Sequence, residues 1–330
     1  MTTLLVASTG GHLKQLHRLH RRLSGVDGPY RWATFDTPQS RSLLEGEAVD
    51  YVHFVGGRDP RSIRNVPLAH RILREHDVDT VVSTGSAVAL PFFALARQRR
   101  LECHYIESDA RSDGPSTTGR LMSHIPGVYL YAQYPAWATG RWHYRGSVFD
   151  SFAPFAPATT AVARSNALKK VVVTLGTYRG YGFGRLVRRL LAILPSDADV
   201  LWQTGDTDTS SLGVNGHYAI PEHDLTQAMG EADVVVGHAG VGTALAALEV
   251  GRCPVLVPRR LVRGEHVDDH QTQIAGELGA RGLSRSVEAD DLTLDDLLIA
   301  ARTPVKSLAE DPPFLTLSAR HSSAFIAAAA

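Results

Sequence analysis

Short runs of apolar residues alternate along the chain with longer segments in which apolar positions recur every three or four residues. In the first half, runs rich in β-branched and aromatic residues predict strands, and two longer segments predict helices. The strand segments are "TLLVAS", "YRWATF", "YVHFV" (51–55), "DTVVST" and "ECHYIES", and the helical segments are "HLKQLHRLHRRL" (12–23) and "VALPFFALARQ" (88–98). Alternation of this kind is typical of a parallel sheet with helices on both faces.

A second series of the same kind follows residue 168. Its strand segments are "KKVVVTLGT", "ADVLWQTG", "DVVVGHAG" and "CPVLVPR", and its helical segments are "GRLVRRLLAIL", "DLTQAMGEA" and "TALAALEVG". We therefore expect an α/β protein with two Rossmann-like doubly wound parallel-sheet domains, over 1–152 and 169–310. The prolines and small residues of 153–168 predict a linker. Residues 311–330 predict a C-terminal helix, for which a return to the first domain is one interpretation.

Length and composition exclude several classes of protein. A chain of 330 residues suits two domains of about 150 residues each. The 34 basic side chains balance 34 acidic ones, which argues against a nucleic-acid partner. Cys103 and Cys253 stand in apolar surroundings and predict core positions, not a disulfide framework or a thiolate metal site. No apolar run approaches about 18 residues, so we expect a cytoplasmic protein, at most peripheral to the inner face of a membrane.

Four junctions between a predicted strand and a predicted helix contain glycine, and they carry the candidate chemistry. They are "STGGH" (8–12), "STGSA" (83–87), "TLGTYRG" (174–180) and "GHAGVGT" (237–243). Glycine lets backbone amides approach a phosphate closely at the positive end of the following helix. Each junction is also explained by a tight turn alone, but four together favour a phosphate ligand at the carboxyl ends of the strands, in a cleft between the domains.

Neither the dinucleotide fingerprint nor a P-loop is present. The two D-x-D pairs, at 197–199 and 206–208, lie in polar turns, so no metal site is expected.

Longer motifs resemble a known enzyme family. "VVGHAGVGTALAALEVGRCPVLVPR" (235–259) and "EHVDDHQTQIAGELGARG" (265–282) resemble the donor-binding half of nucleotide-sugar glycosyltransferases with the GT-B fold. They are similar in particular to the small catalytic subunit of the eukaryotic enzyme that adds the second GlcNAc to dolichol diphosphate, and to bacterial exopolysaccharide counterparts. "STGGHLKQL", "STGSAVALPFFALAR" and "YIESDARSDGPSTTGRL" resemble the partner subunit of that split enzyme, which holds the lipid acceptor. The single-chain peptidoglycan GlcNAc transferase has the same order of motifs. The resemblance covers residues 4 to 283 and implies an inverting, metal-independent transfer from a UDP-sugar, with no cofactor, to a lipid-linked or small-molecule glycan acceptor.

The resemblance also implies a donor site in the second half. It implies phosphate contacts from the glycine turn at 237–243 and from the junction at 174–180, and sugar contacts from the start of the motif at 265–282. The donor residues so implied are Gly176, Thr177, His238, Gly240, Val241, Gly242, Thr243, Arg259, Glu265, His266, Asp269, His270 and Gln271. A polar helix start with Asp268 as its cap is the alternative for the last motif. Ala246 stands where the family usually has an acidic ribose ligand; Glu249 either replaces that ligand or is a solvated charge.

Two residues compete as the base that deprotonates the acceptor hydroxyl. His12 lies in the first turn of a predicted helix, whose positive end favours a neutral ring, although a purely structural role also fits. Glu107 ends a predicted strand, where an acceptor would arrive. The expected acceptor contacts are Gly10, Gly11, Arg111, Ser116, Thr117 and Gly119, with a solvated loop as the alternative at 111–119.

Further alternatives concern the membrane and the reaction. The segment 12–23 combines Lys14, Arg18, Arg21 and Arg22 with interleaved leucines. This pattern fits an amphipathic helix on an anionic membrane, although leucines that face a core are the preferred interpretation. A nucleotide-sugar epimerase of the same fold and a non-catalytic nucleotide-sugar-binding protein are the alternative functions.

Overall fold

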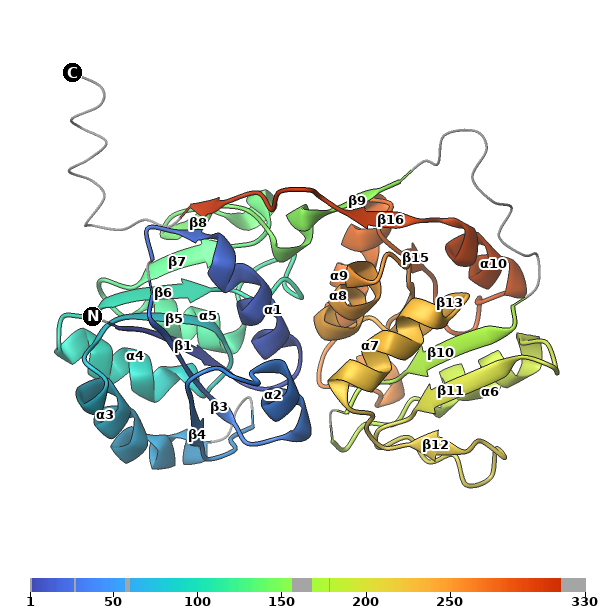
Figure 1. Ribbon diagram of the computed structural model, residues 1–330, viewed down its shortest axis with the longest axis horizontal. Coiled ribbons are helices and arrows are strands. Elements are labelled where there is room, and N and C mark those ends of the chain that lie inside the picture. The colour runs from blue at the N-terminus through green and yellow to red at the C-terminus, as the bar shows by residue number, and fades with distance from the viewer. Residues whose placement is uncertain (1, 27, 57–59, 156–167, 178, 316–330) are drawn as a thin grey trace, which may run out of the picture. The chain divides into compact units, whose positions relative to one another are not determined.

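The computed structural model describes residues 2–26, 28–56, 60–155, 168–177 and 179–315 (Figure 1). The chain divides into two compact units, which consist of Met1–Asp150 with Asp311–Ala330, and of Ser151–Glu310. Residues 156–167 of the expected linker and residues 316–330 of the expected C-terminal helix lie outside the described residues. None of the described helices has the length and apolar character that crossing a membrane requires.

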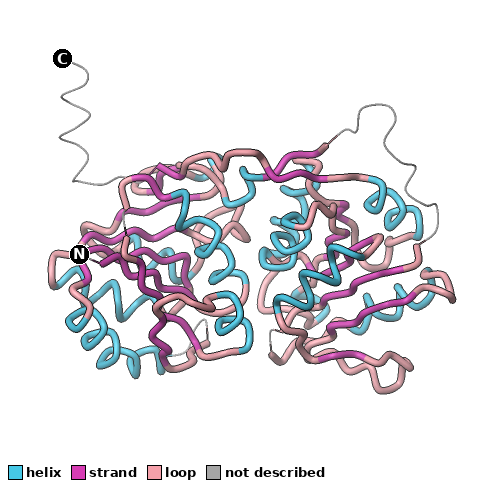
Figure 2. Tube along the Cα trace, viewed as in Figure 1, coloured by secondary structure: helices cyan, strands magenta, loops and turns pink. Residues whose placement is uncertain are grey.

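The first unit is built on a seven-stranded sheet in the order β4-β3-β1-β5-β6-β7-β8, in which all neighbours are parallel (Figures 1 and 2). The strands are β1 (Thr2–Ala7), β3 (Tyr30–Phe35), β4 (Val49–Val52), β5 (Val78–Gly85), β6 (Glu102–Ile106), β7 (Tyr129–Ala132) and β8 (Trp142–Tyr144). The helices are α1 (Gly11–Leu19), α2 (Pro38–Leu43), α3 (Val66–Glu75), α4 (Ala89–Gln98) and α5 (Thr117–Ser123). Alternate strand residues such as Leu4 and Val6 pack into one core with apolar residues of α3 and α4.

The strand order of this sheet reverses between β1 and β5. From β1 the chain proceeds outwards through β3 and β4 and then returns to β5 on the other side. Ligands of open parallel sheets bind beyond the carboxyl ends of the strands at such a switch point. The junction 8–12 follows β1 and the junction 83–87 contains the end of β5, so both lie at the switch point of the first unit.

The second unit has a six-stranded parallel sheet in the order β12-β11-β10-β13-β14-β15. Its strands are β10 (Lys170–Thr174), β11 (Asp199–Gln203), β12 (Gly216–His217), β13 (Val234–His238), β14 (Val255–Val257) and β15 (Arg285–Ser286). Its helices are α6 (Gly184–Ile193), α7 (Glu222–Glu231), α8 (Val241–Glu249), α9 (His270–Ala280) and α10 (Leu294–Arg302). The order reverses between β10 and β13, which are the strands that precede the junctions 174–180 and 237–243. The two parallel sheets agree with the expected pair of Rossmann-like domains.

Two short pairings involve the chain segments near 150 and 310. Strand β9 (Phe152–Pro154) pairs antiparallel with β16 (Val305–Ser307) in the second unit. Strand β17 (Phe314–Leu315) pairs with β2 (Leu23–Ser24) in the first unit, to which residues 311–315 therefore return. The buried Arg22 side chain supports this return, because its Nε donates to the Pro312 carbonyl at 2.7 Å and its Nη1 to the Ser147 carbonyl at 2.9 Å.

Several of the described segments differ from the sequence expectation. Residues 311–315, expected to begin a helix, instead contain strand β17, because Phe314 and Leu315 pair with β2. The strand expected at 51–55 is β4, which ends at Val52. The Asn65 side chain bonds both the amide and the carbonyl of His53, at 2.9 Å each, and so takes the place of a neighbouring strand. The helix expected over 12–23 ends at Leu19 and is followed by a 3₁₀ turn, His20–Arg22.

The membrane interpretation of segment 12–23 is wrong. The leucines and two of the four cations, Lys14 and Arg22, are buried, and Arg18 forms an ion pair with Asp311 at 2.8 Å. The preferred interpretation, in which the leucines face the core, is confirmed.

Candidate active site

The turn between β13 and α8 leaves backbone amides at the start of the helix without a side-chain cap. Gly240 is the N-cap of α8, and no side chain of the described residues caps this helix or places an acidic group in its first turn. The Gly240 amide donates to the His238 carbonyl at 2.8 Å. The amides of Val241, Gly242 and Thr243 thus remain for a phosphate at this helix start, whereas the expected Gly240 amide already has a partner in the turn.

His238 explains two of the glycines at this end of the sheet. A Cβ atom on Gly176 would lie 2.7 Å from its Cε1, and one on Gly240 would lie 2.4 Å from its Nε2. The Nδ1 atom lies 3.4 Å from the Thr243 hydroxyl. Burial, together with the nearby charge of Arg259, lowers the pKa of His238 to about 3, so the ring is neutral at physiological pH. Gly176 and Gly240 thus make room for a neutral imidazole between the two strand ends.

Gly237 has a different function. A Cβ there would lie 2.6 Å from the Thr243 Cγ2 atom and 3.0 Å from the Thr174 carbonyl oxygen. This glycine allows α8 to begin directly against the sheet. The first turn of α8 is consequently fixed by close packing.

The loop after β10, which contains Gly176 and Thr177, is held by a buried arginine and an exposed aspartate. The Arg259 guanidinium is buried and donates to the Leu175 carbonyl at 2.5 Å and to the Tyr181 carbonyl at 3.2 Å. The Asp206 carboxylate accepts from the Gly180 amide at 2.5 Å. Burial lowers the pKa of Arg259 to about 10, which still leaves it charged. Arg259 was expected among the donor contacts. In the structure its guanidinium fixes the two ends of this loop, at Leu175 and Tyr181. Its buried positive charge also lies near His238, at the end of β13.

Several residues of the motif "EHVDDHQ" contact the protein itself. Glu265 forms a two-point ion pair with Arg185, at 3.0 Å for each contact, and accepts from the Arg260 amide. Asp269 accepts from the Leu261 amide at 3.0 Å, and the Gln271 side-chain carbonyl accepts from the Arg259 amide at 3.0 Å. These side chains order the start of α9 and the segment that precedes it.

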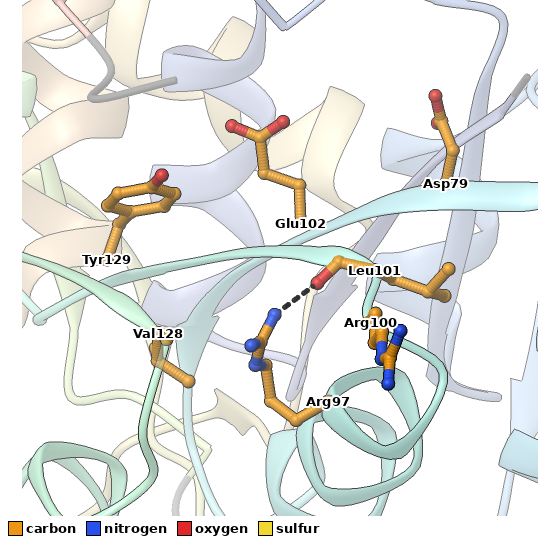
Figure 3. Close-up of a pocket in the computed structure, with 8 residues that line it drawn as sticks. Asp79, Arg97, Arg100, Leu101, Glu102, Val128 and Tyr129 are labelled. Carbon is orange, nitrogen blue, oxygen red and sulfur yellow. Dashed lines mark hydrogen bonds between the residues drawn. The ribbon is translucent and has the colours of Figure 1, made fainter. Parts of the chain in front are cut away.

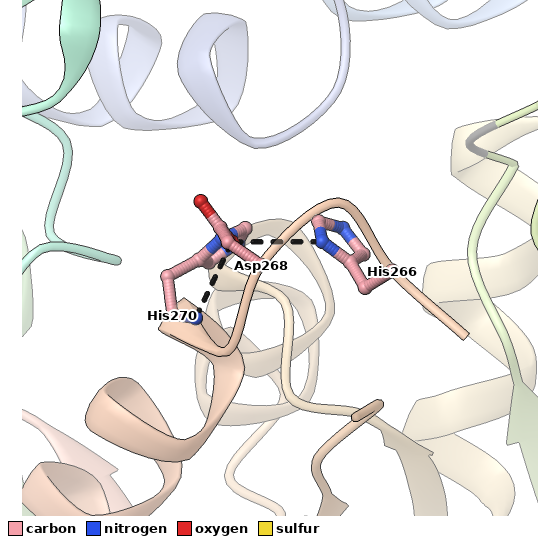
Figure 4. A group of neighbouring side chains, drawn as sticks. All are labelled: His266, Asp268 and His270. Atoms are coloured by element: carbon pink, nitrogen blue, oxygen red, sulfur yellow. Dashed lines mark hydrogen bonds and ion pairs between the residues drawn. The ribbon is translucent and has the colours of Figure 1, made fainter. Parts of the chain in front are cut away.

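The two histidines of the motif lie with Asp268 in a compact group (Figure 4). Asp268 accepts hydrogen bonds from the His270 amide and from its Nδ1 atom, and His266 stacks on Tyr181 with ring centroids 5.8 Å apart. The expected cap at Asp268 is therefore present on the His270 amide, although Asp269 is the formal N-cap residue.

The ribose side of the expected donor site has no acidic group at the start of α8. Ala246 is buried in a cluster with Val172 and Met229. Glu249 is exposed at the last position of α8, about 12 Å along the helix from Val241. The structure does not bring Glu249 to the glycine turn.

In the first unit, His12 lies at the switch point between β1 and β5. Its Nδ1 atom donates to the Thr84 carbonyl at 2.6 Å, and the Thr84 hydroxyl donates back to the His12 carbonyl at 2.8 Å. A neutral ring with a proton on Nδ1 accepts protons at Nε2. Gly10 and Gly11 lie at the start of the same helix, and the Gly10 amide donates to the Gln39 side chain at 2.6 Å.

Glu107 is fully buried and accepts from three donors. These are the Ser108 amide at 2.9 Å and the Ser116 amide and hydroxyl at 2.9 and 3.0 Å. The Ser116 hydroxyl also caps α5 by accepting from the Gly119 amide at 3.0 Å. Burial raises the pKa of Glu107, and the three donors oppose that rise. Of the expected acceptor contacts, Ser116 holds this carboxylate and Gly119 leaves room for it, whereas Thr117 is exposed.

A buried polar network, which the sequence pattern does not predict, joins α1 to the loop after β6. Gln15 Oε1 accepts from the Asp109 amide at 2.8 Å and from the Gln133 side chain at 3.0 Å, and Gln15 Nε2 donates to the Ser108 hydroxyl. Gln15 lies three residues after His12, on the buried face of α1, and this spacing is the only signal of the network in the sequence. The network ties the segment that leads to Arg111 to the helix that carries His12.

Two hollows in the first unit contain none of the expected site residues. One, of about 460 Å³, is lined by Asp79, Glu102 and Tyr129 at the amino-terminal ends of their strands and by Arg97, whose Nη1 donates to the Leu101 carbonyl (Figure 3). This is the end of the sheet opposite to the switch-point junctions. The other, of about 580 Å³, is lined by His53, Phe54, Arg61 and Arg64 and follows β4.

Comparison with known proteins agrees with this architecture. Residues 171–311 match the glycosyltransferase family 28 C-terminal domain. The chain is 32% identical to the UDP-N-acetylglucosamine--N-acetylmuramyl-(pentapeptide) pyrophosphoryl-undecaprenol N-acetylglucosamine transferase of Polaromonas naphthalenivorans, over 88% of this chain and 86% of the relative. It is 26% identical to the enzyme of the same name from Prosthecochloris aestuarii, over 76% and 69% of the two chains.

Solved structures show the same fold. MurG of Acinetobacter baumannii superposes with a TM-score of 0.56 at 19% identity, over 91% of this chain and 89% of that one. The glycosyltransferase SnogD of Streptomyces nogalater superposes with a TM-score of 0.56 at 18% identity, over the full length of both chains. The names of the two sequence relatives favour sugar transfer over the epimerase and the non-catalytic alternatives. The chain belongs to glycosyltransferase family 28 and is a glycosyltransferase of the GT-B fold.

Proposed function

We propose that this enzyme transfers N-acetylglucosamine from UDP-GlcNAc, with inversion and without a metal ion, to a hydroxyl of an acceptor carried on a polyprenyl diphosphate. The turn after β13 carries the proposal, because its amides and the buried charge of Arg259 suit a diphosphate. The donor and the lipid carrier come from the names of the relatives. The resemblance of the two halves to the two subunits of the dolichol-diphosphate enzyme supports the same kind of acceptor.

In this proposal, the second unit stabilises the leaving nucleoside diphosphate. The amides of Val241, Gly242 and Thr243 and the Thr243 hydroxyl bind the phosphates, and Thr177 covers them from the exposed loop after β10. Electrostatic stabilisation of the departing diphosphate lowers the barrier to transfer. His270 and Gln271 lie on the side of the donated sugar, where Gln271 acts by fixing the Arg259 backbone.

In the first unit, His12 is the base and Glu107 is a positioning residue. The bond from His12 Nδ1 to the Thr84 carbonyl directs Nε2 to the acceptor hydroxyl, whose proton it takes as the hydroxyl oxygen attacks the anomeric carbon. Glu107 holds the start of α5 through Ser116, so that Arg111 and Thr117 reach the acceptor diphosphate.

Contact with the inner face of the cell membrane is part of the same proposal. Phe54 and Ile63 are each 71% exposed, and Arg61 and Arg64 line the hollow beside Phe54. Apolar side chains among cations suit an anionic lipid surface. We expect sedimentation with phosphatidylglycerol vesicles, which a Phe54→Ser, Ile63→Ser double variant loses. Val262→Ser, at a position 82% exposed in the second unit, is the control and should sediment as the parent does.

Two measurements on the purified protein test the reaction. Calorimetry with UDP, dTDP, GDP and ADP, with and without magnesium, should show selective binding of UDP that magnesium does not change. Transfer from labelled UDP-GlcNAc to a polyprenyl-diphosphate-linked sugar should fall by about 100-fold or more in His12→Ala, with UDP binding intact. The exposed His223→Ala is the control. A His12→Ala variant as active as the control would remove His12 as the base, and failure to bind any of the nucleotides would refute the proposed donor.

A further inference from the structure

The start of α9 gathers three potential metal ligands of the second unit in one place. The ligand atoms of His266, Asp268 and His270 all lie within 4.8 Å of one another (Figure 4). The three side chains are only 10%, 29% and 17% exposed. They therefore form a partly enclosed group and not a loose surface cluster.

The local structure fixes how these side chains converge. His266 and Asp268 precede α9, and His270 is its first residue. Both histidine Nδ1 atoms face the same carboxylate oxygen of Asp268, which bonds His270 directly and lies 3.7 Å from His266. The two imidazole rings meet edge to face, with centroids 4.7 Å apart, and Tyr181 stacks against the His266 ring.

A single hydrogen-bonded pair does not account for this arrangement. A bond between Asp268 and His270 is sufficient to orient the His270 ring. It gives no reason for a second imidazole to present its Nδ1 to the same carboxylate oxygen. Two imidazole nitrogens beside one carboxylate oxygen, all within 4.8 Å of one another, form a ligand set that a metal ion can use.

The donor set selects a class of ion. Two imidazole nitrogens and one carboxylate oxygen suit Zn²⁺, Co²⁺ or Ni²⁺, and three protein ligands leave a coordination position open. Mg²⁺ and Ca²⁺ prefer sites built from oxygen ligands. The site is thus distinct from the magnesium sites of metal-dependent nucleotide chemistry.

We propose that His266, Asp268 and His270 bind a divalent transition-metal ion, and that the bound ion inhibits the enzyme. The inhibitory part rests on the proposed function, in which His270 faces the donated sugar. An ion bound by Nδ1 replaces the contact with Asp268 that orients the His270 ring, so the ring no longer presents its Nε2 atom to a sugar hydroxyl. The ion therefore weakens binding of the UDP-sugar and leaves binding of UDP, which has no sugar to place there, unchanged.

Metal binding is tested first, on the full chain without an affinity tag. Titration with Co²⁺, followed by its visible absorption, and calorimetry with Zn²⁺ should each show one ion per chain. His266→Gln and His270→Gln should bind it at least about tenfold more weakly. His223→Gln, at an exposed position elsewhere in the unit, should bind it as the parent does. Equal affinity in all the variants, or no binding by the parent, would overturn the site.

The inhibitory part is tested separately. UDP-GlcNAc and UDP are titrated into the protein with and without one equivalent of Zn²⁺. We expect Zn²⁺ to weaken UDP-GlcNAc binding by about tenfold or more, and this effect should disappear in His270→Gln. Unchanged UDP-GlcNAc affinity would refute the inhibition. If UDP-GlcNAc does not bind the metal-free parent at all, the proposed donor fails, whereas the Co²⁺ titration still decides the metal site.

Discussion

Gly205 and Gly213 form a matched pair for testing the loop after β10. Both have left-handed backbones, with φ of 54° and 65°. A Cβ on Gly205 would lie 2.0 Å from the Gly176 carbonyl oxygen, whereas one on Gly213 would meet no atom within 4 Å. Alanine at either position therefore carries the same backbone strain, of about 1–2 kcal/mol. Only Gly205→Ala adds a collision with the candidate donor site.

The size of the collision sets the expected effect. Cβ atoms essentially never approach another heavy atom within 3.0 Å, so the Gly176 carbonyl has to move by at least 1 Å, the difference between 3.0 and 2.0 Å. Leu175 and Gly180, on either side, are held by Arg259 and Asp206, so the displacement falls on Gly176 and Thr177. A shift of about 1 Å at a reacting site lowers turnover by about 100-fold.

The assay compares the two variants with the parent by UDP calorimetry, by kcat/KM for transfer and by urea denaturation. We expect Gly213→Ala to lose about 1–2 kcal/mol of unfolding free energy with unchanged UDP affinity. Gly205→Ala should lose at least as much stability, bind UDP about tenfold more weakly and transfer about 100-fold more slowly. A Gly205→Ala variant that binds UDP as tightly as Gly213→Ala would show that the 176–177 loop does not contact the donor.

Three further predictions concern buried groups. Gly119→Ala places a Cβ 2.1 Å from a Glu107 oxygen that buried donors hold, so thermal denaturation should show a loss of about 2–4 kcal/mol; a melting curve like that of the parent would contradict this. Burial lowers the pKa of His17 to about 4, so the unfolded chain takes up more protons, and stability should fall as the pH drops from about 6.5 towards 4. In urea denaturation, the fall in unfolding free energy from pH 7.5 to pH 5 should be about 1 kcal/mol smaller in His17→Phe than in the parent. The difference is no larger because solvent screens this half-buried ring. An equal fall in both proteins would refute the assignment to His17. Arg185→Met leaves the buried Glu265 without its ion pair and should cost about 3–5 kcal/mol in urea denaturation, whereas Arg185→Met with Glu265→Gln should recover part of that loss.

The fold could be predicted from the sequence because the pattern of a parallel sheet is local. Runs such as 171–174 and 234–236 have β-branched residues at every position, as is typical of strands buried on both faces. The helices between them are long enough for the three-to-four-residue spacing of their apolar positions to distinguish them from strands. The positions of the glycine junctions after β1, β5, β10 and β13 could also be predicted, since each follows a strand directly. The end of β4 could not be predicted, because it depends on the bonds of His53 to Asn65, twelve residues further along the chain.

The candidate site was predicted less completely than the fold, and the reason is physical. The sequence names polar residues but not their partners. Ser116, Glu265 and Gln271 were expected to contact substrates. In the structure the side-chain oxygens of each of them form hydrogen bonds with neighbouring protein groups. Such bonds join residues far apart in the chain, as Gln15 and Ser108 are with a sequence separation of 93, and no local pattern encodes them.

This distribution of contacts bears on how the enzyme binds a charged donor. The groups placed at the turn after β13 are backbone amides and a hydroxyl, and the nearby cation, Arg259, is buried with its hydrogen bonds committed to carbonyls. A phosphate bound there gains from dipoles and a charge that are already fixed, so little reorganisation accompanies the build-up of charge on the leaving diphosphate. Exposed lysines would attract the donor as strongly but would have to be ordered on binding, at a cost of about 0.5–1.5 kcal/mol for each side chain. Gly176 and Gly240 help to fix these groups, because they leave room for the neutral His238 ring between the two strand ends. The motif of the proposed donor site thus consists mainly of residues that hold its backbone in place.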